Sequence, residues 1–185
     1  MSKQLLSSDT KSNRTNLAFL IVFGVAFGFV EAAVVYYLRD LLNFHAGYAI
    51  TSYRTLLNLG FITFVLPGHS LLMNSRISSI EIIRETATII MLISIAFIAG
   101  KNRKQRVGAF LVSFACWDIS YYVFLKILAN WPSNFLTKDV YFLIPVTWIG
   151  PVITPLIISP IMLAMGVKLY LHRPRRPNLN QSKIY

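Results

Sequence analysis

Three acidic side chains, Glu31, Glu85 and Asp118, lie inside stretches of the chain that are otherwise apolar enough to cross a bilayer. An ionised carboxylate in hydrocarbon costs at least about 2.5–3.5 kcal/mol on insertion scales, so it usually faces a partner, a cavity or a pathway. Buried carboxylates of this kind can bind cations or relay protons. These three residues are therefore the candidate ion-binding or proton-binding site.

Helical spacing gives each acid its neighbours. Glu81 and Glu85 share a helical face with Arg84 beside them, whereas Asp118 shares a face with two tyrosines. Clustered carboxylates in a medium of low dielectric constant cannot all stay ionised, so we expect Arg84 to neutralise an acid and to set the protonation of the others. The supporting residues expected around the site are Glu81, Trp117, Tyr121, Tyr122, Asp139 and Trp148.

Long apolar stretches define the expected fold. The chain has 185 residues, is 55% hydrophobic and has a mean hydropathy of +0.58, which is too apolar for a soluble domain. Four stretches approach the roughly 20 residues that a bilayer span needs, at about 16–38, 78–99, 107–128 and 143–169. We expect an all-α integral membrane four-helix bundle that forms a single domain, residues 1–185.

The connection between the first two spans, residues 40–77, is the expected outer excursion of the chain. Its apolar part, 56–73, is interrupted by Asn58 and Gly60 and broken at Pro67, so it is too short to be a span. We expect this segment to be an interfacial or re-entrant helix. Prolines at positions 145, 151, 155 and 160 predict that the outer half of the fourth span is not a regular helix.

Charge placement predicts the orientation. The net charge of +11 does not indicate nucleic-acid binding, because the 18 Lys and Arg residues fall between the apolar stretches rather than on one folded face. With four spans, twelve of these residues lie on the side of the two termini and six on the other side. The positive-inside rule then predicts that both termini, including the tail 171–185, are cytoplasmic. Anionic lipids are the partners expected at that face.

The three acids are expected at one depth in the bilayer. Measured from the cytoplasmic ends at 1.5 Å per residue, Glu31 and Glu85 lie about 22 Å and Asp118 about 18 Å along their helices. These positions define a slab of roughly 5 Å on the outer side of the midplane. Small residues at positions 24, 28 and 32 would let a neighbouring helix approach Glu31 closely.

A divalent metal is the cofactor that the residue types would allow. His45 and His69, both in the outer excursion, could join the carboxylates in a mixed nitrogen and oxygen shell. The chain has no tight ligand spacing such as HExxH or ExxH, and His172 is expected on the opposite side of the membrane. The lone Cys116 lies in an apolar stretch and is expected to be a small core residue.

Four strings of the sequence resemble a group of small bacterial polytopic membrane proteins: FGVAFGFVEAAVVYYLR (23–39), EIIRETATIIML (81–92), RVGAFLVSFACWDISYYVFLKIL (106–128) and WPSNFLTKDVYFLIPVTWIGPVITP (131–155). The similarity covers most of the helical region and is specific in its Glu, Arg-Glu, Trp-Asp and Asp positions. The resemblance implies a multi-pass protein of the bacterial inner (plasma) membrane. It implies no particular activity.

The leading hypothesis is a small inner-membrane protein with a polar pocket that opens toward the outer face and binds a cation or relays protons, with the kinked start of the fourth span as its wall. The alternative is a non-catalytic subunit or scaffold, as a homo-oligomer or in a larger complex, whose acids hold helices together by pairing with Arg84, Arg39, Tyr121 or Tyr122. A third is a metal-dependent intramembrane enzyme acting on lipid or quinone. Nucleotide and hydrolase chemistry have no support, because Walker A, GxGxxG and GxSxG motifs are absent.

Overall fold

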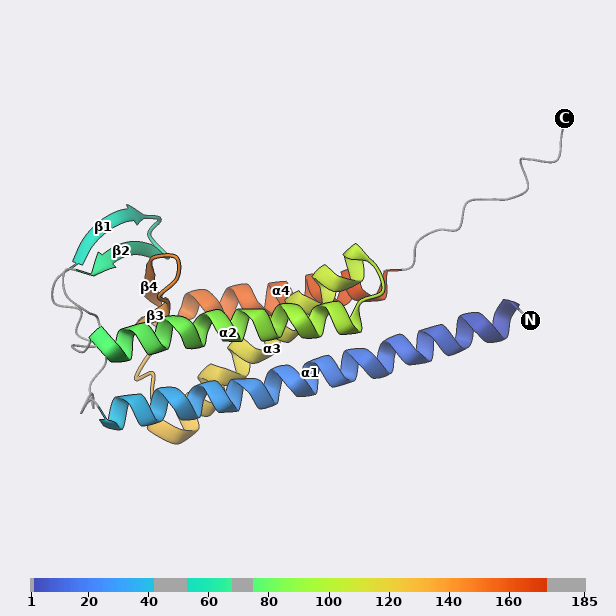
Figure 1. Ribbon diagram of the computed structural model, residues 1–185, viewed down its shortest axis with the longest axis horizontal. Helices are drawn as coiled ribbons and strands as arrows, with labels where there is room; N and C mark the ends of the chain where they lie inside the picture. Colours follow the sequence, from blue (N-terminus) through green and yellow to red (C-terminus); the bar gives the residue numbers. More distant parts are fainter. Residues whose placement is uncertain (1, 42–52, 68–74, 173–185) are drawn as a thin grey trace, which may run out of the picture.

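Four α-helices make up most of the part of the protein that the structure describes. The computed structural model describes residues 2–41, 53–67 and 75–172. The helices are α1 (Ser2–Leu41), α2 (Ser75–Ala99), α3 (Arg103–Ala129) and α4 (Ile153–Leu171). They run roughly along one axis, and a small sheet lies at the end where α1 ends and α2 begins (Figure 1). We call this the sheet end; α1 begins and α4 ends at the opposite end (Figure 1).

Each helix contains a segment that is long and apolar enough to cross a membrane: Ser12–Leu41, Arg76–Ala99, Arg103–Ala129 and Ile153–Leu171. The prediction of four long apolar helices is therefore confirmed, and the first three predicted spans fall inside these segments. The fourth prediction, 143–169, begins too early, because α4 starts only at Ile153. Residues before it follow an extended path in a stretch where Pro145 and Pro151 lack the N–H that a helix interior requires.

The prediction of an all-α fold is wrong, because the chain also forms a four-stranded antiparallel sheet. Its strands are β1 (Tyr53–Asn58), β2 (Thr63–Pro67), β3 (Lys138–Phe142) and β4 (Thr147–Pro151), in the spatial order β1-β2-β4-β3. Two hairpins, one from each half of the chain, meet at the pairing of β2 with β4. Thr63, Phe64 and Val65 lie opposite Ile149, Trp148 and Thr147 in this pairing.

The first hairpin replaces the helix expected within residues 56–73. Asn58 ends β1, and its Oδ1 accepts a hydrogen bond from the Gly60 N–H at 2.8 Å, which forms a tight turn. Gly60 has a φ of 84°, which a residue without a side chain adopts without strain. The residues of β2 are mostly β-branched or aromatic and favour a strand. The remainder of the predicted helix, 68–73, lies outside the described residues.

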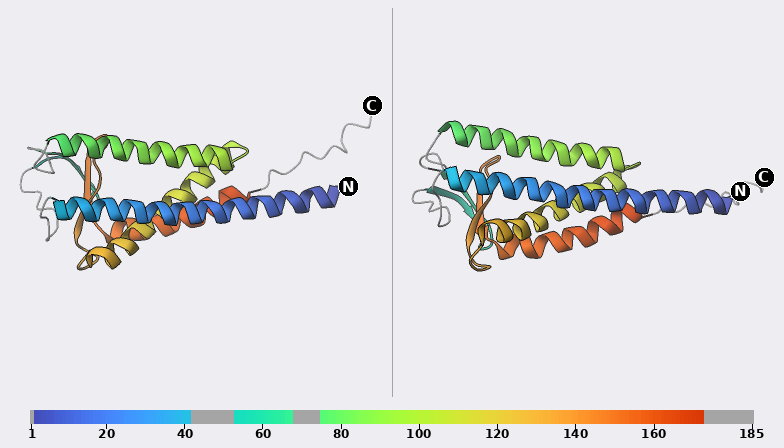
Figure 2. Two further views of the ribbon diagram at one scale, coloured as in Figure 1. Left: turned by 60° about the horizontal axis from the view of Figure 1, so that its bottom comes forward. Right: turned by 90° about the horizontal axis from the view of Figure 1, so that it is seen from below.

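α3 is the central helix of the bundle, and small residues bring α1 and α4 close to it. A Cβ placed on Gly24 would lie 2.7 Å from the Ser113 carbonyl oxygen of α3. At the other end of α3, a Cβ on Gly108 would lie 2.8 Å from the Gly166 carbonyl oxygen of α4. α2 contacts α3 but touches α1 only slightly, and the views in Figure 2 show α1 and α2 as two separated rods.

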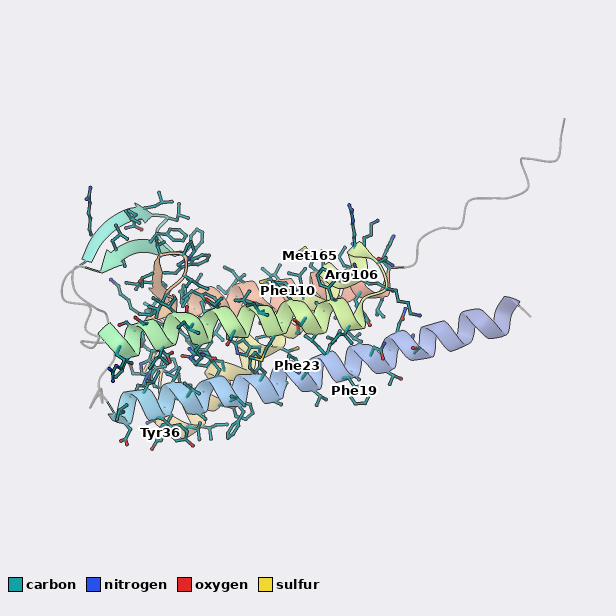
Figure 3. The ribbon with its side chains drawn as sticks, viewed as in Figure 1. Phe19, Phe23, Tyr36, Arg106, Phe110 and Met165 are labelled. Carbon is teal, nitrogen blue, oxygen red and sulfur yellow. The ribbon has the colours of Figure 1, made fainter. Side chains whose placement is uncertain are left out.

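The outward faces of the helices are apolar. Phe19 on α1 is 68% exposed, and Tyr36 and Met165 are also exposed (Figure 3). By contrast, the interior near the opposite end is filled by a buried cluster that includes Leu20, Val112 and Tyr170. This arrangement, with large hydrophobic side chains on the outside, suits a hydrocarbon environment better than water.

Candidate functional site

A cavity of about 370 Å³ lies within the half of the bundle nearest the sheet. It is lined by all four helices and by β3 and β4. Its lining includes the four predicted ion-binding or proton-binding residues, Glu31, Arg84, Glu85 and Asp118. It also includes the predicted supporting residues, which are Glu81, Trp117, Tyr121, Tyr122, Asp139 and Trp148. The fold thus brings together side chains that are up to 117 positions apart, from Glu31 to Trp148.

The acids of the three helices lie at similar distances from the sheet end. At 1.5 Å per residue, Glu31 is about 15 Å from the end of α1 at Leu41, and Glu85 is about 15 Å from the start of α2 at Ser75. Asp118 is about 17 Å from the end of α3 at Ala129. Three helices that alternate in direction therefore present their carboxyl groups to one region of the bundle.

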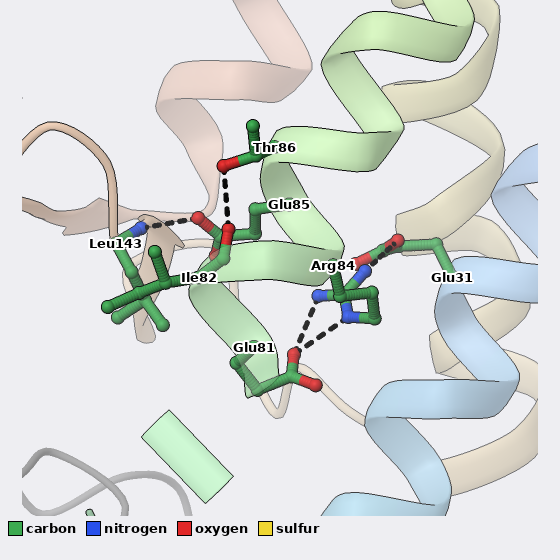
Figure 4. Close-up of polar contacts among 7 residues, drawn as sticks. All are labelled: Glu31, Glu81, Ile82, Arg84, Glu85, Thr86 and Leu143. Carbon is green, nitrogen blue, oxygen red and sulfur yellow. Dashed lines mark hydrogen bonds and ion pairs between the residues drawn. The ribbon is translucent and has the colours of Figure 1, made fainter. Parts of the chain in front are cut away.

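Arg84 joins α2 to α1 through a shared ion pair. Its NH1 lies 2.6 Å from Glu31 Oε2 on α1, and its NH2 lies 2.7 Å from Glu81 Oε2 on its own helix (Figure 4). Its Nε also donates to Glu81 Oε2 at 2.8 Å. Because α1 and α2 contact each other so little elsewhere, this ion pair is a principal link between them. One guanidinium thus balances part of the charge of two carboxylates.

Glu85 points to the other side of α2. Successive residues of a helix are rotated by about 100°, and Figure 4 shows Arg84 directed toward α1 while Glu85 is directed toward the β3–β4 connection. Glu85 Oε2 accepts a hydrogen bond from the backbone N–H of Leu143 at 2.8 Å. Arg84 therefore makes ion pairs with Glu31 and Glu81 and acts on Glu85 through its charge alone, and the hydrogen-bond donor to Glu85 is neutral.

Asp118 is also bonded by a neutral donor. Its Oδ2 accepts from the hydroxyl of Ser159 on α4 at 2.6 Å. Ser159 lies one position before Pro160, in the part of α4 that lines the cavity. Sequence reasoning did not identify Ser159, because a serine in an apolar helix is common and most often bonds its own backbone. The first turns of α4 form part of the wall as well, through Thr154, Pro155 and Ile158.

Asp139, on β3, closes the cavity toward the sheet. Its side chain is buried, and its Oδ2 accepts from the Tyr122 hydroxyl at 2.9 Å. Burial raises the pKa of Asp139 from 3.8 to about 6, although the bond from Tyr122 and the positive charge of Arg39 both act to lower it. The Arg39 guanidinium stacks over the Trp131 ring at 4.0 Å. Arg39 thus supplies a positive charge near Asp139 rather than at the acids of α2.

Aromatic side chains form another wall of the cavity. The ring centroids of Phe114 and Trp117 lie 5.2 Å apart, those of Trp117 and Phe142 6.1 Å, and those of Phe142 and Trp148 6.0 Å. Among the described residues, the indole Nε1 atoms of Trp117 and Trp148 are buried without a hydrogen-bond partner. Buried N–H groups without an acceptor are uncommon in folded proteins, so these two call for an acceptor that the described residues do not supply.

Tyr141 and Thr154 line the cavity as well, although sequence reasoning did not select them for the site. Tyr141 donates from its hydroxyl to the Pro151 carbonyl oxygen at 2.6 Å, and burial raises the pKa of this tyrosine to about 12. Thr154 donates to the Phe61 carbonyl oxygen at 3.1 Å, which ties α4 to the first hairpin. Their hydroxyls therefore hold the wall of the cavity in place.

The described residues do not support the hypothesis of a divalent metal site. His45 and His69 lie outside the part of the chain that the structure describes. Within that part, no three His, Cys, Asp or Glu side chains come close enough together to share a metal ion. The carboxylates surround a space instead of converging on one point. Cys116 is a buried core residue beside Gly24.

No protein-family model, curated protein or solved structure matches this chain. The function must therefore be argued from the cavity and the residues that line it.

Proposed function

We propose that this chain is a four-span protein of the bacterial inner membrane whose cavity binds a cation in exchange with protons. Glu85 and Asp118 are the carboxylates that take part in the exchange. The observation that carries the proposal is the cavity itself, because a 370 Å³ space lined by five acids and one arginine has an excess of negative charge. In hydrocarbon such charge is retained where a cation or a proton offsets it.

The orientation supports access from outside the cell. Of the 14 Lys and Arg residues in the part of the chain that the structure describes, eight lie toward the opposite end, and the positive-inside rule places such segments in the cytoplasm. The sheet end, and with it the cavity, would then face the outer side of the membrane. Glu31 and Glu81 share Arg84, so their role in this proposal is to hold α1 to α2 and to position the guanidinium.

Proton release upon cation binding tests this function. Purified protein in a weakly buffered detergent solution at pH 7 is mixed with sodium, potassium, magnesium or tetramethylammonium chloride, and the released protons are followed with a pH-indicator dye. We expect at least one of these cations to release protons from the wild type. Glu85→Gln combined with Asp118→Asn should abolish the release. Asp40→Asn is the matched control, because Asp40 is exposed and does not line the cavity.

Two results would contradict the proposal. One is that none of the four cations releases protons from the wild type. The other is that the double variant, shown to be folded by circular dichroism and gel filtration, releases as many protons as the wild type does.

A scaffold role is the second candidate, and the polar bonds of the cavity favour it. Arg84 links α1 to α2, Glu85 links α2 to the β3–β4 connection, and Asp118 links α3 to α4. If these bonds only hold helices together, Glu85→Gln and Asp118→Asn should lower the unfolding midpoint strongly. Cations should then release no protons from the wild type or from the variants. The same purified samples distinguish the two functions, because stability and proton release are measured independently.

A further inference from the structure

The size of the cavity indicates a molecule rather than a bare ion. Its volume of about 370 Å³ is more than ten times the roughly 30 Å³ that one water molecule occupies in the liquid. It falls within the range of about 300–1,000 Å³ that is usual for small-molecule sites. The described acids also do not converge closely enough to enclose a single metal ion. A small organic ligand fits this space better than an inorganic cation does.

The charge of the lining indicates that the ligand is a cation. Glu31 and Glu81 share Arg84, and Asp139 lies in the field of Arg39. Glu85 also lies in the field of Arg84, but it makes no ion pair with it, and its hydrogen-bond donor, the Leu143 N–H, is neutral, as is the Ser159 hydroxyl that donates to Asp118. Each bond engages one carboxylate oxygen, and a carboxylate has about four acceptor positions, so both acids keep capacity for a ligand. An anionic ligand would be repelled here.

The aromatic wall narrows the class of cation. Trp117, Phe142 and Trp148 line the cavity together with Phe114, and their rings are in contact in series. Aromatic rings beside carboxylates are the surroundings in which proteins recognise organic ammonium ions, through cation–π attraction and burial of the methyl or methylene groups. A strongly hydrated inorganic ion gains little from such a wall. The lining therefore suits an ammonium group that carries carbon.

Two indole N–H groups indicate that the ligand also has an acceptor. Trp117 is only 6% exposed, and its Nε1 has no hydrogen-bond partner among the described residues; the same holds for the buried Nε1 of Trp148. Each Nε1 has less than 1 Å² of accessible surface, so a hydroxyl, ether or ester oxygen on the ligand would supply the missing acceptor once the indole turns toward the cavity. The distance between the cationic group and this oxygen must be short, because the same cavity holds both.

We infer that the cavity binds an organic ammonium ion bearing an oxygen acceptor close to its nitrogen, as in an amino alcohol. This inference rests on the proposed function and names the class of its cation. Two sources share this chemistry: a soluble amine, or the ethanolamine headgroup of a lipid. In this inference Glu85 and Asp118 are the carboxylates that bind the ammonium group, and Trp117 and Trp148 are the donors to the oxygen.

Calorimetric titration of the purified protein in detergent tests the inference with three ligands. Choline has both the ammonium group and the oxygen, tetramethylammonium has only the former, and dimethylbutanol is the neutral carbon isostere of choline. We expect choline to bind at least about tenfold more tightly than dimethylbutanol and more tightly than tetramethylammonium. This comparison uses the wild type alone, so it holds even if a variant fails to fold. Equal affinity for choline and its neutral isostere would overturn the inference.

Variants assign the two ends of the ligand. Asp118→Asn should weaken choline and tetramethylammonium binding alike, by about tenfold or more. Trp117→Phe keeps an aromatic ring but removes the N–H together with the five-membered ring of the indole, so it should weaken choline binding more than it weakens tetramethylammonium binding. Asp40→Asn should alter neither. If inorganic cations release protons from the protein, but choline neither binds nor releases protons, the inference fails and the proposed function stands.

Lipid composition separates the two sources. The protein is placed in nanodiscs of phosphatidylglycerol alone or of phosphatidylglycerol mixed with phosphatidylethanolamine, and the choline titration is repeated. Weaker choline binding in the mixed discs identifies the lipid headgroup as the occupant, because the headgroup then competes for the site. Equal binding in both discs identifies a soluble amine. Either result supports the ammonium site, whereas no choline binding in either disc contradicts it.

Discussion

Arg84 supplies the ion pair that joins α2 to α1. Removing the guanidinium would leave Glu31 and Glu81, whose side chains are 12% and 9% exposed, without their shared positive charge. Breaking a buried pair by removing one partner typically costs about 3 kcal/mol or more. We therefore expect Arg84→Gln to lower the free energy of unfolding by about 3 kcal/mol, measured by denaturation of the purified protein in detergent.

The double variant Glu31→Gln with Arg84→Gln provides the check on this assignment. It removes one of the stranded charges, so it should recover part of the stability that Arg84→Gln loses. Arg103→Gln is the matched control, because Arg103 is exposed in the first turn of α3 and should be close to neutral. An Arg84→Gln variant as stable as the wild type would show that the ion pair contributes little.

Asp139 makes stability depend on pH. Its pKa is 3.8 in its ordinary state and about 6 in the folded protein, where burial disfavours the charged form. The folded state therefore binds a proton more tightly than the unfolded state, and the free energy of unfolding falls as the pH rises from about 4 to 6. We expect this loss to be about 3 kcal/mol and to be absent from Asp139→Asn.

Unfolding of the wild type and of Asp139→Asn at several pH values measures this difference. Because Tyr122, Arg39 and Asp118 also act on Asp139, the comparison uses the difference between the two proteins rather than the wild-type curve alone. The two curves should diverge between about pH 4 and pH 6 and run parallel above it. Curves that stay parallel throughout this range would contradict the assignment.

Among the helices, the packing of α1 against α3 depends on Gly28. A Cβ at this position would lie 2.6 Å from the Trp117 carbonyl oxygen and 2.9 Å from the Tyr121 backbone nitrogen, both of them backbone atoms that cannot move independently. Overpacking of this kind typically costs about 1–3 kcal/mol. Gly28→Ala should therefore destabilise the protein by about that amount in a detergent unfolding assay.

Ala26→Leu is the control for this prediction, because Ala26 lies on the exposed face of α1 and the substitution should be nearly neutral. The result that would contradict close packing is a Gly28→Ala protein with the stability of the wild type. The ridge of small residues at 24, 28 and 32 was identified from sequence, because small residues four positions apart lie on one face of a helix.

Helices and strands differed in how well the sequence predicted them. The four helices were predictable because each is a long apolar stretch bounded by polar residues. The strands were not, because each has only five or six residues, and the apolar run around Phe61 fits a short buried helix as well as a hairpin. The turn at Asn58 and Gly60 was the available signal for the hairpin, and we interpreted it as an interruption of a helix.

At the scale of the whole molecule, the charged residues of the site could be predicted from the sequence, whereas its neutral polar residues could not. The reason is that only a charge is costly in an apolar stretch. Glu31, Glu85 and Asp118 were identified because acids are rare in apolar stretches. Ser159 and Tyr141 were missed because hydroxyls are common in helices and strands of any kind. The indole groups of Trp117 and Trp148 were identified as supporting residues, but their missing acceptors depend on side-chain packing that no sequence pattern records.

The topology of the whole molecule gives the last prediction. The Gly100–Asn102 turn between α2 and α3 lies at the opposite end of the molecule from the sheet, near the end of α4 (Figure 1). If the basic end is cytoplasmic, a cysteine at position 101 is shielded from the outside, whereas one at position 133, between α3 and β3, is exposed to it. We expect a membrane-impermeant maleimide to label Ser133→Cys in intact spheroplasts and Lys101→Cys only after permeabilisation, both in a Cys116→Ala background. Labelling of both positions in intact spheroplasts would contradict the predicted topology. The reverse pattern would place the carboxylate cavity on the cytoplasmic side, where a soluble amine would have to reach it from within the cell.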